Sequence, residues 1–229
     1  MFVFKDFLIF LKTPGSSEQI NMNSFPNFIK LVWKSICVLL IFDVVLGLLI
    51  ILPLKLYSLY PSIKELELKQ VNTLYIILVL PILEELLFRL PLRISINNIL
   101  ASLGIFIYIL IRLCFFHSRV IAIFFSLALV LGLHQIIKKE SDTVNSILGI
   151  LKNRFWILFY IQALLFGFLH LTNYNLDFKY LYLFPLVAFS YIIPGIFWGY
   201  LRVRYSSGIY LCIVSHITVN SIYCLLILH

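Results

Sequence analysis

The chain has 229 residues, of which 62% are hydrophobic and only 12% are charged. Ordinary soluble domains are about half apolar and a quarter charged, so this composition excludes a soluble globular protein and requires lipid to cover many side chains. The net charge of +8 does not indicate a nucleic-acid partner, because the Lys and Arg residues occur in short connections between apolar runs. That distribution is typical of cytoplasmic loops and of contacts with lipid headgroups.

The N-terminal stretch from Met1 to Lys12 is apolar but too short to span a membrane, and it predicts a helix lying in the membrane interface. A polar linker follows, so residues 1–30 are interpreted as an interfacial and polar N-terminal segment. About 20 apolar residues cross the hydrocarbon core as a helix. Seven runs approach that length: 34–54, 72–93, 99–116, 120–137, 154–171, 179–200 and 208–228. The sequence therefore predicts an all-α fold, a polytopic bundle of about seven transmembrane helices in one integral membrane domain over residues 1–229.

The distribution of positive charge predicts the orientation of these spans. Lys and Arg are more frequent in the connections that share a side with the N-terminus, which places the N-terminus in the cytoplasm. Two features inside the spans are interpreted as packing. Gly195 and Gly199 form a GxxxG pattern typical of close helix contacts. Asp43, in the first span, is expected to pair with a neighbouring helix.

Strongly polar residues are concentrated in three of the predicted spans. The second span contains EELLFR over residues 84–89, the fifth ends in FGFLH over 166–170, and the seventh contains HITVN over 216–220. An ionisable group near the membrane centre costs at least a few kcal/mol and usually marks a functional site. These segments are therefore the candidates for chemistry.

Helical spacing suggests roles for several of these residues. Glu85 and Arg89 lie four residues apart on one helix face and are expected to form an ion pair. Glu84 is rotated away from that pair and remains available as a general base. His216 and Asn220 are also four apart, so their N–H donors can point at one carbonyl oxygen and form an oxyanion hole.

The three segments resemble the EExxxR, FxxxH and HxxxN motifs of the CAAX-protease and bacteriocin-processing family, also called CPBP or Abi. The resemblance covers roughly residues 80–223 and includes a glycine-bearing segment, GIFWGYLR, before the last motif. It implies a membrane endopeptidase acting on a peptide or protein substrate, with Glu84 activating water, His170 holding that water, and His216 and Asn220 stabilising the oxyanion. Glu85 and Arg89 would support the site. The family's members trim prenylated CAAX proteins in eukaryotes and act on peptides or in bacteriocin immunity in bacteria, and we expect a bacterial cytoplasmic membrane here.

One departure from the family pattern and two alternatives remain open at this stage. The long separation between EELLFR and FGFLH predicts a possible extra hairpin over residues 99–137. Glu84, His170 and His216 are zinc-ligand types, but the sequence has no HExxH motif and Arg89 disfavours a divalent cation, so we favour a metal-free site with Zn²⁺ as the alternative. The rival function is a non-enzymatic membrane immunity factor or scaffold that uses the same residues as a polar packing core.

Overall fold

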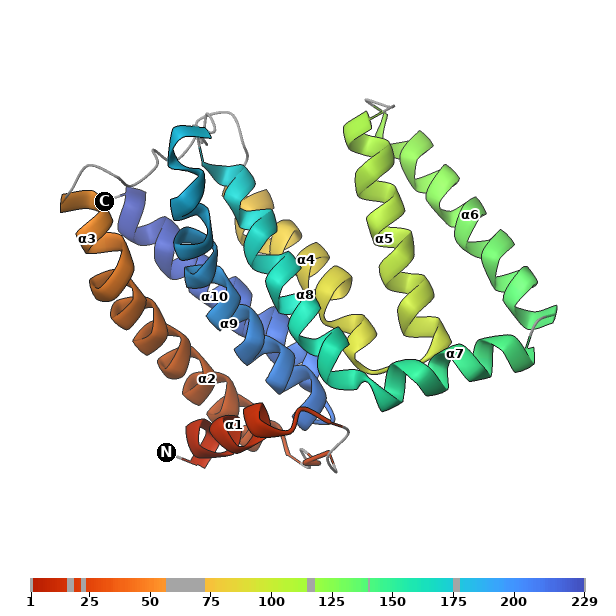
Figure 1. Ribbon diagram of the computed structural model, residues 1–229, viewed down its shortest axis with the longest axis horizontal. Coiled ribbons are helices and arrows are strands. Elements are labelled where there is room, and N and C mark those ends of the chain that lie inside the picture. Colours follow the sequence, from red (N-terminus) through yellow and green to blue (C-terminus); the bar gives the residue numbers. More distant parts are fainter. Residues whose placement is uncertain are drawn as a thin grey trace.

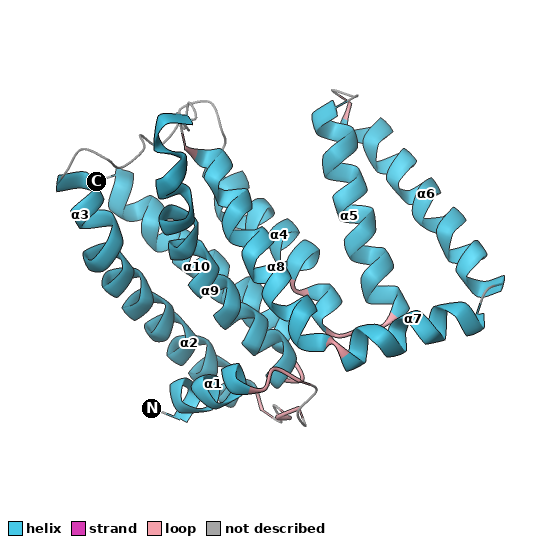
Figure 2. Cartoon of the chain, in the orientation of Figure 1, coloured by secondary structure: helices cyan, strands magenta, loops and turns pink. Residues whose placement is uncertain are grey.

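The structure, a computed structural model, describes residues 2–15, 19–21, 24–56, 73–114, 118–139, 141–174 and 178–228 (Figure 1). Helices make up nearly all of this part of the chain, and Figure 2 draws no strand in it. One isolated bridge joins Ile20 to Tyr205. The predicted all-α fold is confirmed.

The helices follow one another with short connections. In chain order they are α1 (Phe2–Lys12), α2 (Phe25–Leu46) with its continuations η1 (Gly47–Ile51) and α3 (Leu52–Leu56), η2 (Tyr75–Val79), α4 (Leu80–Phe88), η3 (Leu90–Leu92), α5 (Ile96–Cys114), α6 (Arg119–Lys139), α7 (Ser141–Asn153), α8 (Phe155–His170), η4 (Leu171–Asn173), η5 (Phe178–Leu183), α9 (Phe184–Arg204) and α10 (Gly208–Leu228). Helices occupy the described residues of all seven predicted spans, and α1 occupies the predicted interfacial segment; residues 72, 115 and 116 of the predicted spans lie outside the described residues.

Two details of the spans differ from the prediction. Among the described residues, 5 helices rather than seven are long and apolar enough to cross a membrane: Phe25–Leu56, Val120–Lys138, Phe155–Asn173, Leu181–Arg204 and Gly208–Leu226. The second predicted span is shorter than expected because α4 ends at Phe88, before Pro91. Proline has no backbone N–H and therefore cannot continue the hydrogen-bond ladder of an α-helix.

Helix α7 was not predicted. Its polar residues, including Asp142 and Asn145, kept it out of every apolar run, although Ile147 and Ile150 lie exposed along it. In Figure 1, α7 lies across the same end of the bundle as α1, at a steep angle to the long helices. Both helices therefore suit an interfacial position at one membrane surface. Which surface faces the cytoplasm stays a prediction.

The core of the molecule is formed by α2, α4, α8, α9 and α10, which pack against one another. Helices α5 and α6 form a hairpin that stands to one side in Figure 1, and this hairpin coincides with the predicted insertion over residues 99–137. Helix α5 packs against α4, and α7 joins the hairpin to α8. The hairpin is thus attached to the bundle beside the helix that carries Glu84.

Helix α1 is fixed to the bundle by one buried face and one ion pair. Phe7 packs edge-on against Phe197 with a ring separation of 5.2 Å. The Asp6 carboxylate lies 2.9 Å from the Arg204 Nε atom and accepts a hydrogen bond of 2.8 Å from the Tyr200 hydroxyl. Asp6 therefore has a structural partner on α9, which explains a charge in an otherwise apolar segment.

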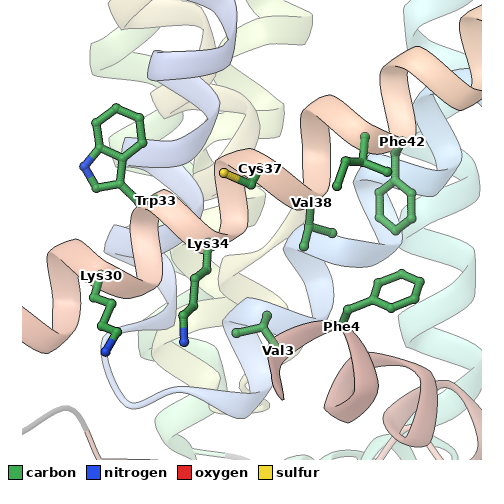
Figure 3. Close-up of a pocket in the computed structure, with 9 residues that line it drawn as sticks. Val3, Phe4, Lys30, Trp33, Lys34, Cys37, Val38 and Phe42 are labelled. Atoms are coloured by element: carbon green, nitrogen blue, oxygen red, sulfur yellow. The ribbon is translucent and has the colours of Figure 1, made fainter. Parts of the chain in front are cut away.

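A hollow of about 660 Å³ lies between α1 and the stretch of α2 from Lys30 to Phe42. Figure 3 shows Lys30 and Lys34 pointing to one side of α2 and Trp33 to the other, with Val3 of α1 nearby. Tryptophan and lysine together are typical of the membrane–water interface. This part of α2 is therefore expected to lie at headgroup level.

Glycines permit the close contact between α8 and α9. A Cβ atom added at Gly167 would lie 2.9 Å from the Ala188 carbonyl oxygen and would also meet the Ile192 side chain. At Gly199 it would lie 2.8 Å from a ring carbon of Phe159, and at Gly195 it would lie 3.0 Å from Phe166. Gly195 and Gly199 are packing residues, as predicted.

We expect Gly167→Ala to destabilise the protein, because the Ala188 backbone and the Ile192 side chain leave no room for a methyl group. Overpacking of this kind typically costs about 1–3 kcal/mol. The matched control is Gly149→Ala, since a Cβ there meets nothing within 4 Å. The measurement is the thermal unfolding midpoint in detergent. Equal midpoints for the two variants would show that the α8–α9 contact accommodates a methyl group without loss of stability, which would contradict the prediction.

Candidate active site

Glu84 lies between two histidines contributed by different helices. Its Oε2 atom is 4.0 Å from Nε2 of His170, at the end of α8, and 3.7 Å from Nε2 of His216, on α10. These three residues and Asn220 line one cavity of about 450 Å³. The structure thus brings together all four residues to which the sequence assigned catalytic roles.

Glu85 is fully buried and contacts two of the other polar residues. Its Oε2 atom lies 3.6 Å from Nε of Arg89, which is 1% exposed, so the predicted ion pair is present. Its Oε1 atom lies closer, at 2.9 Å, to Nδ1 of His216. This second contact joins residues 131 positions apart, so it could not be predicted from helical spacing. Glu85 therefore supports His216 as well as Arg89.

The partners of the two imidazoles define their protonation. Nδ1 of His170 lies 2.8 Å from the Phe166 carbonyl oxygen, which only accepts hydrogen bonds, so this nitrogen carries a proton. Nδ1 of His216 donates in the same way to the Glu85 carboxylate. In the neutral tautomers inferred from these partners, both Nε2 atoms are unprotonated acceptors that face Glu84.

Aromatic rings hold both imidazoles in place. Trp198 stacks on His216 with a centroid separation of 4.2 Å, and its indole N–H donates to the Ser215 hydroxyl at 3.0 Å. Tyr191 stacks on His170 at 4.5 Å. Neither ring was predicted as part of the site. Trp198 lies in the glycine-bearing segment GIFWGYLR. The resemblance of this segment to the family was the feature of the sequence that could have identified Trp198.

The contacts of Phe166 account for an aromatic residue at the start of the FGFLH segment. Its ring lies 4.5 Å from the His170 ring and 6.2 Å from the His216 ring. The Arg89 guanidinium lies 4.5 Å over the face of the same ring, which is a cation–π contact. Phe166 therefore packs against both imidazoles and the Arg89 guanidinium and helps to hold them in place.

Two arginines connect the end of α4 to the α9–α10 junction through hydrogen bonds. Arg202 is buried, and its Nε donates to the Arg89 carbonyl at 3.1 Å. Arg93 donates to the Arg202 carbonyl at 3.2 Å and to the Ser206 carbonyl at 2.8 Å. Neither contact was predicted from the sequence. Both arginines satisfy helix-terminal carbonyls and so position the segment that carries Glu84 and Glu85.

Asp43 has the neighbouring-helix partner that was expected of it. Its side chain is hydrogen-bonded with Tyr223 of α10, and both residues line the cavity that contains Glu84. Asp43 therefore belongs to the wall of the site, which its position in the first span did not reveal.

The zinc alternative requires ligand atoms at suitable separations. Zinc–ligand bonds of about 2.0–2.1 Å place the ligand atoms of a tetrahedral site roughly 3.3 Å apart. The carboxylate of Glu84 lies 3.7 and 4.0 Å from the two Nε2 atoms. Among the described residues, no group of three or more His, Cys, Asp or Glu side chains is arranged to hold a metal ion. As placed, Glu84, His170 and His216 do not fit a zinc site without movement.

A bundle of apolar helices that encloses carboxylates, imidazoles and an amide defines an integral membrane protein with a buried polar site. The chain belongs to the family described as Type II CAAX prenyl endopeptidase Rce1-like, which matches residues 68–222. This confirms the predicted resemblance, and it places the chain in a family of peptide-bond hydrolases. No curated protein and no solved structure matches the chain.

Proposed function

We propose that this protein is an intramembrane endopeptidase that hydrolyses peptide bonds of membrane-associated peptides or proteins with a water activated by Glu84. The observation that carries the proposal is the convergence of Glu84, His170, His216 and Asn220 on one cavity within the bundle. Hydrolysis requires a base beside a water molecule and donors for the developing oxyanion. The four side chains offer both kinds of group.

Glu84 and His170 suit the activation of water. The separation of 4.0 Å between the Glu84 carboxylate and Nε2 of His170 is too long for a direct hydrogen bond. A water molecule beside them would donate one proton to the carboxylate and the other to the unprotonated Nε2 of His170. Its oxygen would attack the scissile carbonyl carbon as Glu84 takes the first proton. Glu84 would then return that proton to the amine nitrogen as the C–N bond breaks.

The oxyanion donors differ in how they supply a proton. The Asn220 amide carries N–H groups in every state. His216 already uses its Nδ1 proton on Glu85, so it donates from Nε2 only when the ring holds a second proton. The Glu85 carboxylate, at 2.9 Å, is the group that would balance that charge. Glu85 would therefore act as a positioning residue for His216.

Asn220→Ala is expected to lower the turnover number by roughly a hundredfold or more, the scale seen on loss of one oxyanion donor. The KM should change little, because this contact strengthens only in the transition state. Steady-state kinetics on a cleaved peptide measure both quantities. A change confined to KM would assign Asn220 to substrate binding and remove it from the oxyanion site.

The metal-free site predicts that strong chelators leave activity unchanged. The proposed steps use only side chains of this chain, so removal of divalent cations should not slow them. Activity is measured before and after extraction, together with the metal content of the purified protein. A stoichiometric zinc ion, with activity lost on extraction and restored on readdition, would favour the zinc alternative while leaving the protease assignment in place.

The direct test of the proposed function is cleavage by the purified protein in liposomes. The probe is a library of quenched peptides, compared between wild type and Glu84→Gln at equal folded protein. Cleavage by wild type alone supports the proposal. Absence of cleavage by wild type would contradict it and favour the non-enzymatic alternative.

A further inference from the structure

The hollow between α1 and α2 lies apart from the candidate active site (Figure 3). One face of α2 lines this hollow, whereas the opposite face contributes Leu39 and Asp43 to the cavity that contains Glu84. The two spaces share no described lining residue. The volume of about 660 Å³ falls within the range of roughly 300–1,000 Å³ that is usual for ligand sites. The hollow is therefore large enough to be a second binding site.

One end of the hollow is cationic. Lys30 and Lys34 are exposed, lie one helical turn apart and both line it, and Figure 3 shows the two side chains extending to the same side of α2. Trp33, between them in sequence, also lines the hollow. Among its described lining residues there is no Asp or Glu, and the acidic side chain of α1, Asp6, is paired with Arg204. The hollow thus offers two cations to a negatively charged ligand.

The rest of the hollow is apolar and has the length of one membrane leaflet. Val38 and Ile41 line it beyond the lysines, and the rings of Phe4 and Phe42, 6.1 Å apart, join α1 to α2 at its far end. Twelve residues of α2 separate Lys30 from Phe42, which corresponds to a rise of roughly 18 Å. Half of a bilayer with its headgroups is roughly 20 Å thick. The hollow therefore matches a ligand with an anionic head and a long apolar chain.

We propose that the hollow between α1 and α2 binds one anionic phospholipid, with its phosphate at Lys30 and Lys34 and an acyl chain along α2. Basic pockets on the cytoplasmic side of membrane helices are typical sites for anionic headgroups, and the predicted orientation places Lys30 on that side. Lysine binds phosphate as a point charge, and each methylene group that is buried adds to the affinity. In a zwitterionic phospholipid, the headgroup cation offsets the phosphate, so an anionic lipid is favoured.

The test measures lipid retained by the full-length purified protein. The protein in mild detergent receives equal amounts of phosphatidylglycerol and phosphatidylcholine with identical acyl chains, and native mass spectrometry counts each bound lipid. Wild type is compared with Lys30→Gln/Lys34→Gln and with the charge-conserving Lys30→Arg/Lys34→Arg. The matched control, Lys12→Gln/Lys152→Gln, removes two exposed cations that do not line the hollow, from α1 and α7. A parallel sample contains excess glycerol 3-phosphate, which has the phosphate without acyl chains.

Wild type and Lys12→Gln/Lys152→Gln are expected to bind phosphatidylglycerol roughly thirtyfold more tightly than phosphatidylcholine, about fivefold for each lysine near a membrane surface. Lys30→Gln/Lys34→Gln should lose this preference, and Lys30→Arg/Lys34→Arg should keep it. Phosphatidylglycerol should also raise the unfolding midpoint of wild type, because a ligand of the folded state stabilises it, and should not raise that of Lys30→Gln/Lys34→Gln.

Three results would overturn the lipid site. Wild type could retain the two lipids equally, or Lys30→Gln/Lys34→Gln could keep the preference of wild type. An equal loss of preference in Lys12→Gln/Lys152→Gln would show a diffuse effect of surface charge. Displacement of the lipid by glycerol 3-phosphate would assign the lysines to a free phosphate instead. None of these measurements uses peptide cleavage, so their outcome is separate from that of the proposed function.

Discussion

Replacing Glu84 with glutamine is expected to lower peptide cleavage by roughly a hundredfold to ten-thousandfold, the contribution typical of a positioned acid–base group. Glutamine keeps the size of the side chain but cannot take a proton from water at neutral pH. Because Glu84 is only partly buried and touches the cavity, the substitution should leave folding intact. Initial rates at matched concentrations of monodisperse protein measure the effect.

The control for this experiment is Asp142→Asn, which removes an exposed carboxylate at the start of α7. It should cleave peptides at the wild-type rate. If Glu84→Gln retained more than about a tenth of wild-type activity, Glu84 would not be the general base, because loss of a base costs more than that.

Arg89→Ala is expected to lower the free energy of unfolding by about 3–5 kcal/mol, the usual effect of removing one partner from a buried ion pair. Glu85 is 0% exposed and Arg89 is 1% exposed, so the carboxylate would lose its cation without gaining water. The substitution also removes the guanidinium that packs 4.5 Å over the Phe166 ring. The yield of monodisperse protein in detergent and its unfolding midpoint report the loss.

The matched control is Arg154→Ala, which removes an exposed arginine at the start of α8. That variant should express and unfold like wild type, since exposed charges contribute little to stability. Equal yields and midpoints for Arg89→Ala and wild type would argue against a structural role for the Glu85–Arg89 pair.

Contacts within single helices were predictable from the sequence. Residues four apart share a helix face, and this rule anticipated the pairing of Glu85 with Arg89. Span boundaries were also recovered where an apolar run had clear ends: residues 208–228 were predicted, and α10 is Gly208–Leu228. The grouping of Glu84 with His170 and His216 came from the resemblance of their motifs, because no local rule connects three separate helices.

Contacts between different helices could not be predicted from the sequence. The hydrogen bond of His216 to Glu85 and the stacking of Trp198 on His216 depend on how α4, α9 and α10 cross. Those crossings are determined by packing, here through small residues such as Gly199. Helix α7 was missed for a different reason, since an interfacial helix has only one apolar face and escapes a search for continuous apolar runs.

The central claim is that this membrane protein cuts peptide bonds with Glu84. The most direct measurement compares the peptide termini present in membranes of cells that make wild type with those of cells that make Glu84→Gln at equal level. The proposed function predicts a set of new N- and C-termini in membrane-associated proteins that occurs with wild type and is missing with Glu84→Gln. Identical sets of termini in the two kinds of cell would contradict it and leave the polar cluster as a packing core.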